Sequence, residues 1–376
     1  MTTLDPVRLT QELVRLNTIN PPGQELACIE RLAAILSAAG LRTSIQMFDQ
    51  SRANLIATLN SPSEGSWLCF TGHVDTVPLG AAPWKQDPFG GEIVDGRLYG
   101  RGATDMKGGV AAFVAAACEA ATNPASPGRV KLIITAGEET GCDGAAQLVK
   151  AGLLEPGGAL VVAEPTSNLP MVGHKGALWL RAATSGVTAH GSMPHLGVNA
   201  AYKAARALTK LESFDFNEAA HPYLGGPTLN VGAVRAGINV NSVPDRAEID
   251  IDIRTIPSLS HTRVKEHLAV ELGHDVSISA LIDLPAVWTN PADTWIDSVL
   301  ATVHAVTGVT PPTAAAPYFT DASLLKPALG EPPTVILGPG EANMAHQTDE
   351  FCLVQRIRDA TEIYSRLISQ WRPARP

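Results

Sequence analysis

The sequence predicts an α/β protein in which a mainly parallel sheet, covered by helices, is interrupted by an inserted α+β domain of the split-βαβ kind. Short apolar runs bounded by Gly or Pro alternate with helical patterns up to Glu164, which is typical of a covered parallel sheet. From Gly176 onward, strands instead alternate apolar and polar residues, as strands with one exposed face do. Near Val287 the first pattern returns, so the simplest account is a small domain inserted into a larger one.

The first part, residues 1–176, reads as alternating helices and strands. Apolar residues at helical spacing predict a helix at Pro6–Leu16, before the break at Pro21-Pro22-Gly23, and another at about Glu25–Ala39, with Gly40 as its C-cap glycine. The further elements expected here are strands at 43–47, 54–59, 67–71, 131–136 and 159–163, and helices at 110–121 and 144–150.

The inserted part, residues 177–287, has the order strand, helix, strand, strand, helix, strand, which is the split βαβ arrangement. The expected elements are strands at 177–184, 228–234, 246–254 and 275–281, and helices at 199–211 and 261–272. The last part, residues 288–376, is expected to rejoin the first domain through a helix at 294–306, a strand at 334–337 and a helix at 351–371.

Composition and charge exclude several classes of protein. The chain is 45% apolar and 17% charged, as ordinary soluble proteins are, and its net charge of −9 comes without any Lys- or Arg-rich block. We therefore expect neither a nucleic acid nor a membrane as partner. The N-terminus lacks the pattern of a signal peptide, and the five cysteines form no Cys-x-x-Cys pair. These features predict a cytoplasmic protein with reduced thiols.

Five short segments place acidic or imidazole side chains where an apolar run ends. They are GHVDTVP at 72–78, GRGATDMKGG at 100–109, GEET at 137–140, AEPT at 163–166 and GPGEANMAHQTDE at 338–350. Four of them directly follow predicted buried strands, and ligands bind outside the carboxyl ends of such strands. We therefore expect His73, the Glu138/Glu139 pair, Glu164 and His346 to converge on one edge of one sheet. This convergence predicts a metal site.

The residue types in these segments suit a pair of divalent ions. Carboxylate oxygen and imidazole nitrogen hold redox-inert divalent ions, and two ions about 3.5–4 Å apart need a bridging carboxylate and an open position for water. One set meets the count: His73 and Glu164 for one ion, Glu139 and His346 for the other, and Asp105 between them. Asp75, two residues after His73, leaves an extended chain on the same side and can hydrogen-bond the imidazole.

Glu138 and Glu139 are adjacent, so in an extended chain they point to opposite sides and cannot bind one ion in the same way. One as ligand and one as general base for metal-activated water is a natural division of roles. Taken singly, a His-x-Asp at a strand end or a Glu pair is more often structural, so the joint pattern carries the argument. Competing templates are missing: the sequence has no Gly-x-Ser-x-Gly, His-Glu-x-x-His or phosphate-loop motif.

The motifs also resemble a known superfamily. GHVDTVP, DGRLYGRGATDMKGG, GEETG, AEPT, AHGSMPHLGVNA, NSVPDRAEIDIDIR and GPGEANMAHQTDE resemble the aminoacylase/acetylornithine deacetylase/succinyl-diaminopimelate desuccinylase/glutamate carboxypeptidase superfamily of di-zinc hydrolases, in order and over nearly the whole chain. The resemblance implies a zinc-peptidase-like catalytic domain with two divalent ions, zinc foremost and cobalt or manganese as alternatives. It implies the ligand set above, Glu138 as the general base and a cis Asp105–Met106 peptide. We count Asp75 with the catalytic residues because of its expected hydrogen bond to His73.

In similar proteins the inserted domain is a lid and often a dimer surface, so the resemblance implies a homodimer. His190 matches a histidine that polarises the substrate carbonyl, in dimers from the partner chain. Asn241 and Arg254 match residues that contact substrate, and Arg254 is suited to a bidentate grip on a carboxylate. A surface ion pair on its own strand is the alternative for Arg254. Lys175-Gly176 is expected to mark the hinge into the lid.

The resemblance implies a hydrolase that cleaves the amide bond of an N-acyl amino acid or related small carboxylated amide, in the manner of acetylornithine deacetylase and succinyl-diaminopimelate desuccinylase. A dipeptidase, carboxypeptidase or aminopeptidase with the same site is the alternative among enzymes. A non-catalytic metal-binding protein is the alternative of another class, and the intact Glu138 argues against it. The segment from Tyr318 to Asp321 is expected to border the substrate pocket, but the motifs do not specify the acyl group.

Overall fold

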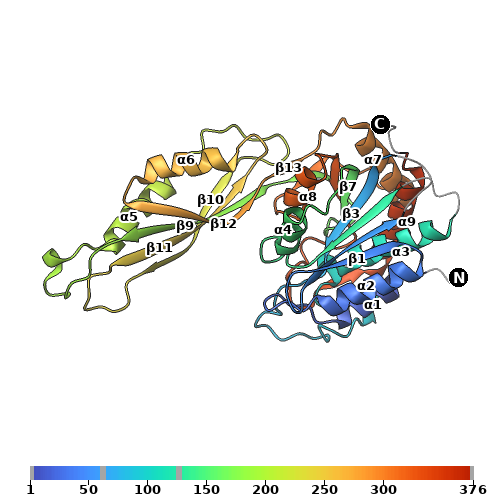
Figure 1. The fold of residues 1–376 in the computed structure, drawn as a ribbon, viewed down its shortest axis with the longest axis horizontal. Coiled ribbons are helices and arrows are strands. Elements are labelled where there is room, and N and C mark those ends of the chain that lie inside the picture. The colour runs from blue at the N-terminus through green and yellow to red at the C-terminus, as the bar shows by residue number, and fades with distance from the viewer. Residues whose placement is uncertain (1–3, 60–64, 124–128, 373–376) are drawn as a thin grey trace. The chain divides into compact units, whose positions relative to one another are not determined.

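The computed structural model describes residues 4–59, 65–123 and 129–372, and the chain divides into two compact units. The larger unit comprises Met1–Gly173, Trp288–Ala314 and Thr320–Pro376, and the smaller unit comprises His174–Val287 and Ala315–Phe319. The larger unit thus combines segments from both ends of the chain, while the smaller unit is built mainly from the middle (Figure 1).

The sheet of the larger unit is mixed, with a parallel core. The core strands are β6 (Val130–Thr135), β3 (Trp67–His73), β7 (Gly157–Val162) and β15 (Thr334–Ile336), each parallel to its neighbour in that order. Antiparallel strands extend it: β1 (Arg42–Met47) and β2 (Ala53–Leu59) on one side, and β8 (Met171–His174) on the other, followed by β13 (Val287–Trp288). β14 (Ala314–Ala316) pairs with β8. All residues of β3 and β6 are buried, which explains why both strands are mainly apolar.

Helices flank this sheet in two groups (Figure 1). The first group is α1 (Pro6–Arg15), α2 (Leu26–Ala38), α3 (Gly108–Thr122), α7 (Thr294–Thr307) and α9 (Val354–Gln370), and the second is α4 (Asp143–Lys150) with α8 (Ala322–Ala328). α3 is buried on all sides from Gly108 to Cys118, so its alanine-rich sequence lies in the core. There the Tyr364 ring of α9 meets Phe70 of β3 edge-on, with ring centroids 5.3 Å apart.

The predicted α/β class is confirmed, and most predicted elements begin and end within a few residues of the observed ones. One predicted element was partly wrong. The helix expected at 351–371 begins only at Val354, because Phe351–Leu353 forms β16 and pairs with β5 (Arg97–Tyr99), which pairs in turn with β4 (Ile93–Val94). Such a short strand depends on a distant pairing partner, which local periodicity does not reveal. Neither α8 nor β8 was predicted.

The smaller unit is an antiparallel sheet with two helices. Its strand order is β10 (Thr228–Ala236), β11 (Arg246–Thr255), β9 (Gly176–Ser185) and β12 (Val276–Leu284), accompanied by α5 (Ala200–Glu212), α6 (His261–Leu272) and a short 3₁₀ turn at Pro194–Leu196. In β11 the isoleucines 249, 251 and 253 are buried, while alternate polar residues are partly exposed. This is the predicted split-βαβ order.

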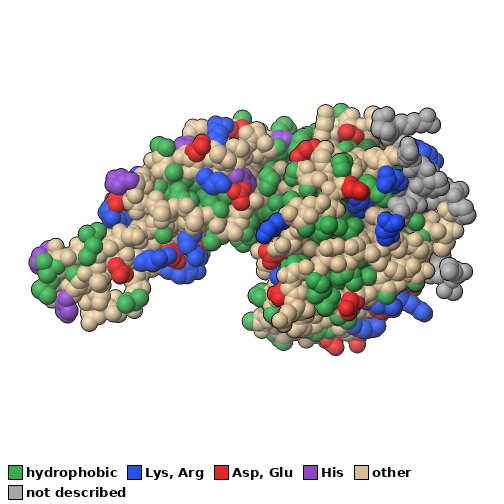
Figure 2. Space-filling view, in the orientation of Figure 1, with side chains coloured by type: hydrophobic (Ala, Val, Ile, Leu, Met, Phe, Trp, Pro, Cys, Tyr) green, Lys and Arg blue, Asp and Glu red, His purple; other side chains and the backbone are tan. Residues whose placement is uncertain are grey.

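On the face in Figure 2, acidic and basic side chains are interspersed, as on an ordinary solvated surface.

Two global features bear on the sequence-based expectations. Within residues 4–59, 65–123 and 129–372, no helix has both the length and the apolar character needed to cross a membrane. All five cysteines fall in these ranges, and each is a buried free thiol.

Candidate metal centre

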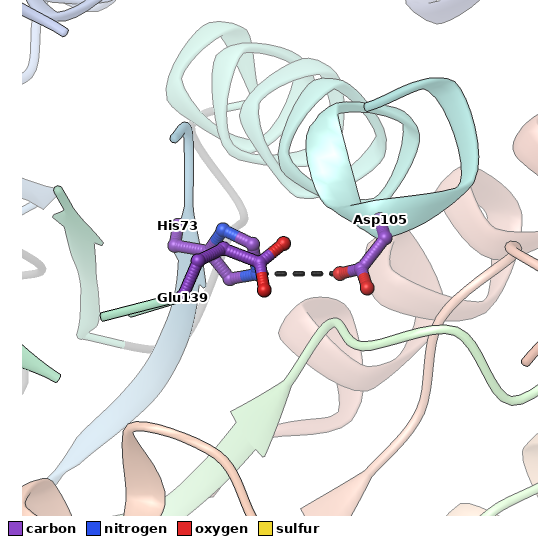
Figure 3. A group of neighbouring side chains, drawn as sticks. All are labelled: His73, Asp105 and Glu139. Atoms are coloured by element: carbon purple, nitrogen blue, oxygen red, sulfur yellow. Dashed lines mark ion pairs between the residues drawn. The ribbon is translucent and has the colours of Figure 1, made fainter. Parts of the chain in front are cut away.

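The candidate centre lies where the parallel strands end. β3 ends at His73, Glu138 and Glu139 follow β6 in a tight turn, and Glu164 follows β7 by two residues. His346 lies on the segment after β15 and has a positive φ of 64°. Asp105 lies in the turn Ala103–Lys107 just before α3, where its backbone angles are not helical, and Asp105–Met106 is cis, as predicted. Figure 3 shows His73, Glu139 and Asp105 facing one another.

The two oxygens of Asp105 face two different histidines. Asp105 Oδ1 lies 3.2 Å from His73 Nε2, and Asp105 Oδ2 lies 3.4 Å from His346 Nε2. Each histidine also has a second carboxylate: Glu164 Oε1 is 3.8 Å from His73 Nε2, and Glu139 Oε2 is 3.1 Å from His346 Nε2. The structure therefore gathers all five expected ligands into two His–Glu pairs with Asp105 between them.

Asp75 contacts both His73 and the turn that carries Glu138 and Glu139. It is fully buried, its Oδ1 is 3.4 Å from His73 Nδ1, and its backbone oxygen is 3.0 Å from the same nitrogen. The carboxylate also accepts hydrogen bonds from the backbone N–H groups of Glu138 (3.1 Å) and Glu139 (3.2 Å). Asp75 thus orients both the imidazole and the acidic turn. Asn20, which the sequence did not indicate, donates to Asp75 Oδ2 at 3.0 Å.

The electrostatics of the cluster are those of crowded buried acids. Burial raises the pKa of Glu138 well above its ordinary value, against the charge of His73 and together with the charges of Glu164 and Glu139. Burial and the charge of Asp105 likewise raise the pKa of Glu164. Hydrogen bonds to Asp105 and Glu139 raise the pKa of His346 to about 10. Burial and mutual repulsion therefore both disfavour the charged forms of Glu138 and Glu164 in the absence of a cation.

A divalent cation fits this donor set. His73, Asp105 and Glu139 each offer a ligand atom, and these atoms all lie within 4.8 Å of one another. Among the described side chains, Asp105 Oδ1 and Glu139 Oε1 are buried oxygens without a hydrogen bond. Buried carboxylate oxygens need a partner, and a hard or borderline cation is the partner that oxygen and imidazole donors suit.

The sequence did not indicate several buried polar groups that surround the centre. Arg101 and Glu350 form a buried ion pair beside the loop that carries Asp105, with Nη1 and Oε2 2.7 Å apart. Asp321, on the segment expected to border the substrate pocket, is 2% exposed and accepts a 2.5 Å hydrogen bond from Thr135. Both carboxyl groups contact chain segments far away in sequence, and no local motif marks such contacts.

The remaining candidate residues lie on the smaller unit. His190 and Asn241 are exposed and adjacent, since Gly191 N donates to Asn241 O at 2.7 Å. His190 Nδ1 accepts from Ser192 N at 3.2 Å. Arg254 pairs with Asp252 on the same strand, with Nε and Oδ1 2.9 Å apart, and its guanidinium lies 5.8 Å from the centre of the Phe319 ring. This ion pair is the alternative that the sequence left open for Arg254.

An α/β sheet that collects imidazoles and carboxylates at its strand ends is typical of a metal-dependent hydrolase. The model of peptidase family M20/M25/M40 matches residues 69–370, and the chain belongs to this family. A probable succinyl-diaminopimelate desuccinylase from Staphylococcus epidermidis is 33% identical, covering 96% of each chain. The chain is accordingly a metal-dependent hydrolase of amide C–N bonds.

Solved structures show the same fold. A metallo-carboxypeptidase of the M20 family from Sulfolobus solfataricus superposes with a TM-score of 0.80 at 18% identity, covering 97% of this chain and 98% of that one. A dinuclear metal-binding peptidase of the M20 family from Bacillus subtilis has a TM-score of 0.73 at 17% identity, with coverage of 97% and 96%.

Proposed function

We propose that this protein is a deacylase that hydrolyses the amide bond of an N-acyl amino acid or a related small carboxylated amide. The observation that carries the proposal is Asp105, whose two oxygens face His73 and His346 while each histidine has its own glutamate. This symmetry suits two divalent ions that share one carboxylate.

His73 and Glu164 would hold one ion, Glu139 and His346 the other, and Asp105 both. Zinc is the ion we favour, with cobalt or manganese as alternatives, because the donors are carboxylate and imidazole without thiolate. Such ions, when bound, polarise a carbonyl oxygen and lower the pKa of water. The dinuclear metal-binding relative from Bacillus subtilis supports the stoichiometry.

We assign the general-base role to Glu138. Glu139 Oε2 lies 3.1 Å from His346 Nε2, so its carboxylate already pairs with an expected ligand. Glu138 is buried beside the same cluster, and its backbone N–H donates a hydrogen bond to Asp75. Glu138 takes a proton from the attacking water and passes it to the departing amide nitrogen. A carboxylate whose pKa is raised by burial is suited to both halves of that transfer.

His190, Asn241 and Arg254 would contact the substrate. Asn241 lies beside His190, and Arg254 offers a guanidinium suited to a substrate carboxylate if its pair with Asp252 opens.

The smaller unit would act as a lid and as the surface of a homodimer. Exposed apolar side chains support the dimer: Leu196, Tyr202, Ile238 and Val240 are 63%, 68%, 95% and 103% exposed.

The buried free thiols suit a reducing compartment, so we place the protein in the cytoplasm.

The desuccinylase name of the Staphylococcus epidermidis relative supports an N-acyl amino acid substrate over a peptide. Solved structures of a carboxypeptidase and of dipeptidases with this fold keep carboxypeptidase or dipeptidase activity as the second candidate. A panel of succinyl, acetyl and formyl amino acids and free dipeptides would separate the two. We expect turnover of at least one N-acyl compound and little or none of the dipeptides.

Removing metal should abolish hydrolysis, because bound ions would both polarise the carbonyl and lower the pKa of the attacking water. The measurement is hydrolysis of the best panel substrate by chelator-treated protein, followed by titration with zinc or cobalt. We expect activity to return as metal approaches two ions per chain. Full activity of the chelated, metal-free protein would contradict the proposal.

A further inference from the structure

We propose that Glu350 is a positioning residue that fixes the bridging carboxylate of Asp105 before any ion binds, an inference that rests on the function proposed above. Glu350 lies four residues after His346 and directly before β16. Its side chain is buried and reaches the loop that ends at Asp105. The residue therefore joins two ligand-bearing segments that are far apart in sequence.

Four hydrogen bonds connect the Glu350 side chain to residues 101–105. Glu350 Oε1 accepts from the backbone N–H groups of Thr104 (2.8 Å) and Asp105 (3.1 Å). Glu350 Oε2 accepts from Gly102 N–H (3.0 Å) and from Arg101 Nη1 (2.7 Å). One carboxylate thus binds three backbone N–H groups of a single turn, and one of them belongs to Asp105 itself.

The turn needs such an acceptor. Gly102 has a φ of 84°, and Asp105 and Met106 have non-helical backbone angles, so this stretch does not form a regular helical hydrogen-bond ladder. Buried N–H groups without an acceptor are costly, and one carboxyl group accepts from three of them here. The next residue contributes as well, since Phe351 O accepts from Thr104 Oγ1 at 2.6 Å.

A glutamine cannot replace this carboxylate. Each oxygen faces two donors, so the amide NH₂ of Glu350→Gln would meet donors in either orientation. Arg101, which is 1% exposed, would also lose its charged partner. Glu350→Asp keeps the charge beside Arg101 but shortens the reach toward the Asp105 N–H.

The neighbouring residue offers a matched control. Asp349 Oδ1 accepts from the backbone N–H groups of Lys85 (2.7 Å) and Gln86 (3.3 Å), on a segment that carries none of the proposed ligands. Asn keeps an acceptor oxygen and tolerates the positive φ of 57° found at this position. Asp349→Asn therefore changes an acid in the same turn without touching the Asp105 loop.

The first test uses the unaltered full chain without metal. Hydrogen exchange of peptides covering residues 100–107 should show the N–H groups of Gly102, Thr104 and Asp105 exchanging at least about 100-fold more slowly than in an unstructured chain. Fast exchange that becomes slow only when Co²⁺ is added would overturn the proposal, because the ion rather than Glu350 would then order the loop.

The second test measures Co²⁺ affinity and the visible absorption of the Co²⁺-loaded protein. We expect Glu350→Gln to weaken Co²⁺ binding about 10–100-fold and to change the spectrum. Glu350→Asp should show a smaller change of the same kind, and Asp349→Asn should match the unaltered chain. Should Glu350→Gln fail to fold, Glu350→Asp and the exchange experiment decide.

The outcomes separate this inference from the function on which it rests. Unchanged Co²⁺ affinity and spectrum in Glu350→Gln and Glu350→Asp, with Co²⁺ bound normally by the unaltered chain, would overturn the positioning role alone. Failure of the unaltered chain to bind Co²⁺ would overturn the proposed function, and the inference with it.

Discussion

Glu138→Gln is expected to bind metal as the unaltered chain does and to lose about 10²–10⁴-fold in turnover, the usual contribution of general acid–base catalysis. Gln has nearly the shape of Glu but cannot accept and return a proton. Its backbone N–H would still donate to Asp75, so the turn that carries Glu139 keeps its support. Metal content per chain and kcat on the best N-acyl substrate are the two measurements.

Glu139→Gln is the matched control, because it changes the adjacent residue in the same chemical way. Glu139 lies 3.1 Å from His346, so this variant should lose metal as well as activity. Equal loss of metal in both variants would mean that the roles of the two glutamates are exchanged. Normal turnover by Glu138→Gln would remove Glu138 from the mechanism.

The convergence of the ligands could be predicted because it depends on a general property of parallel sheets. His73, Glu138 and Glu164 each follow a strand that reads as a buried apolar run, and parallel strands present their carboxyl ends at one edge. The side-chain period of a strand placed Asp75 beside His73 by the same reasoning. Local sequence was sufficient for these residues because their own elements set their positions.

The polar groups that hold the loops could not be predicted in this way. Glu350 accepts hydrogen bonds from backbone N–H groups about 245 positions earlier in the chain. Since every residue except proline has such a group, the sequence does not indicate which of them a distant carboxylate will bind. Asn20 reaches Asp75 across 55 residues. For Arg254 the sequence allowed two partners, a substrate carboxylate or an acid on its own strand. The structure shows the ion pair with Asp252, which lies two residues away on the same face of the strand.

His190→Ala is expected to lower kcat by about 10²–10³ with a much smaller change in KM. Nδ1 of this exposed ring lies 2.7 Å from Ser192 Oγ and 3.2 Å from Ser192 N, so Nε2 is the ring nitrogen that we expect to donate to the substrate. A donor aimed at a developing oxyanion stabilises the transition state more than the bound substrate. His195→Ala, a substitution of another exposed histidine on the same segment, is the control and should change neither constant appreciably.

If His190 acts across a homodimer, mixing inactive His190→Ala with inactive Glu138→Gln chains should restore activity. A mixed dimer would have one site carrying both changes and one site carrying neither. With equal amounts of the two variants and free exchange, half of the dimers are mixed and each has one intact site, so roughly a quarter of the original activity should return. Mixing two differently tagged Glu138→Gln chains should restore none. Absence of recovery, with subunit exchange demonstrated through the tags, would place His190 in its own chain's site or outside the mechanism.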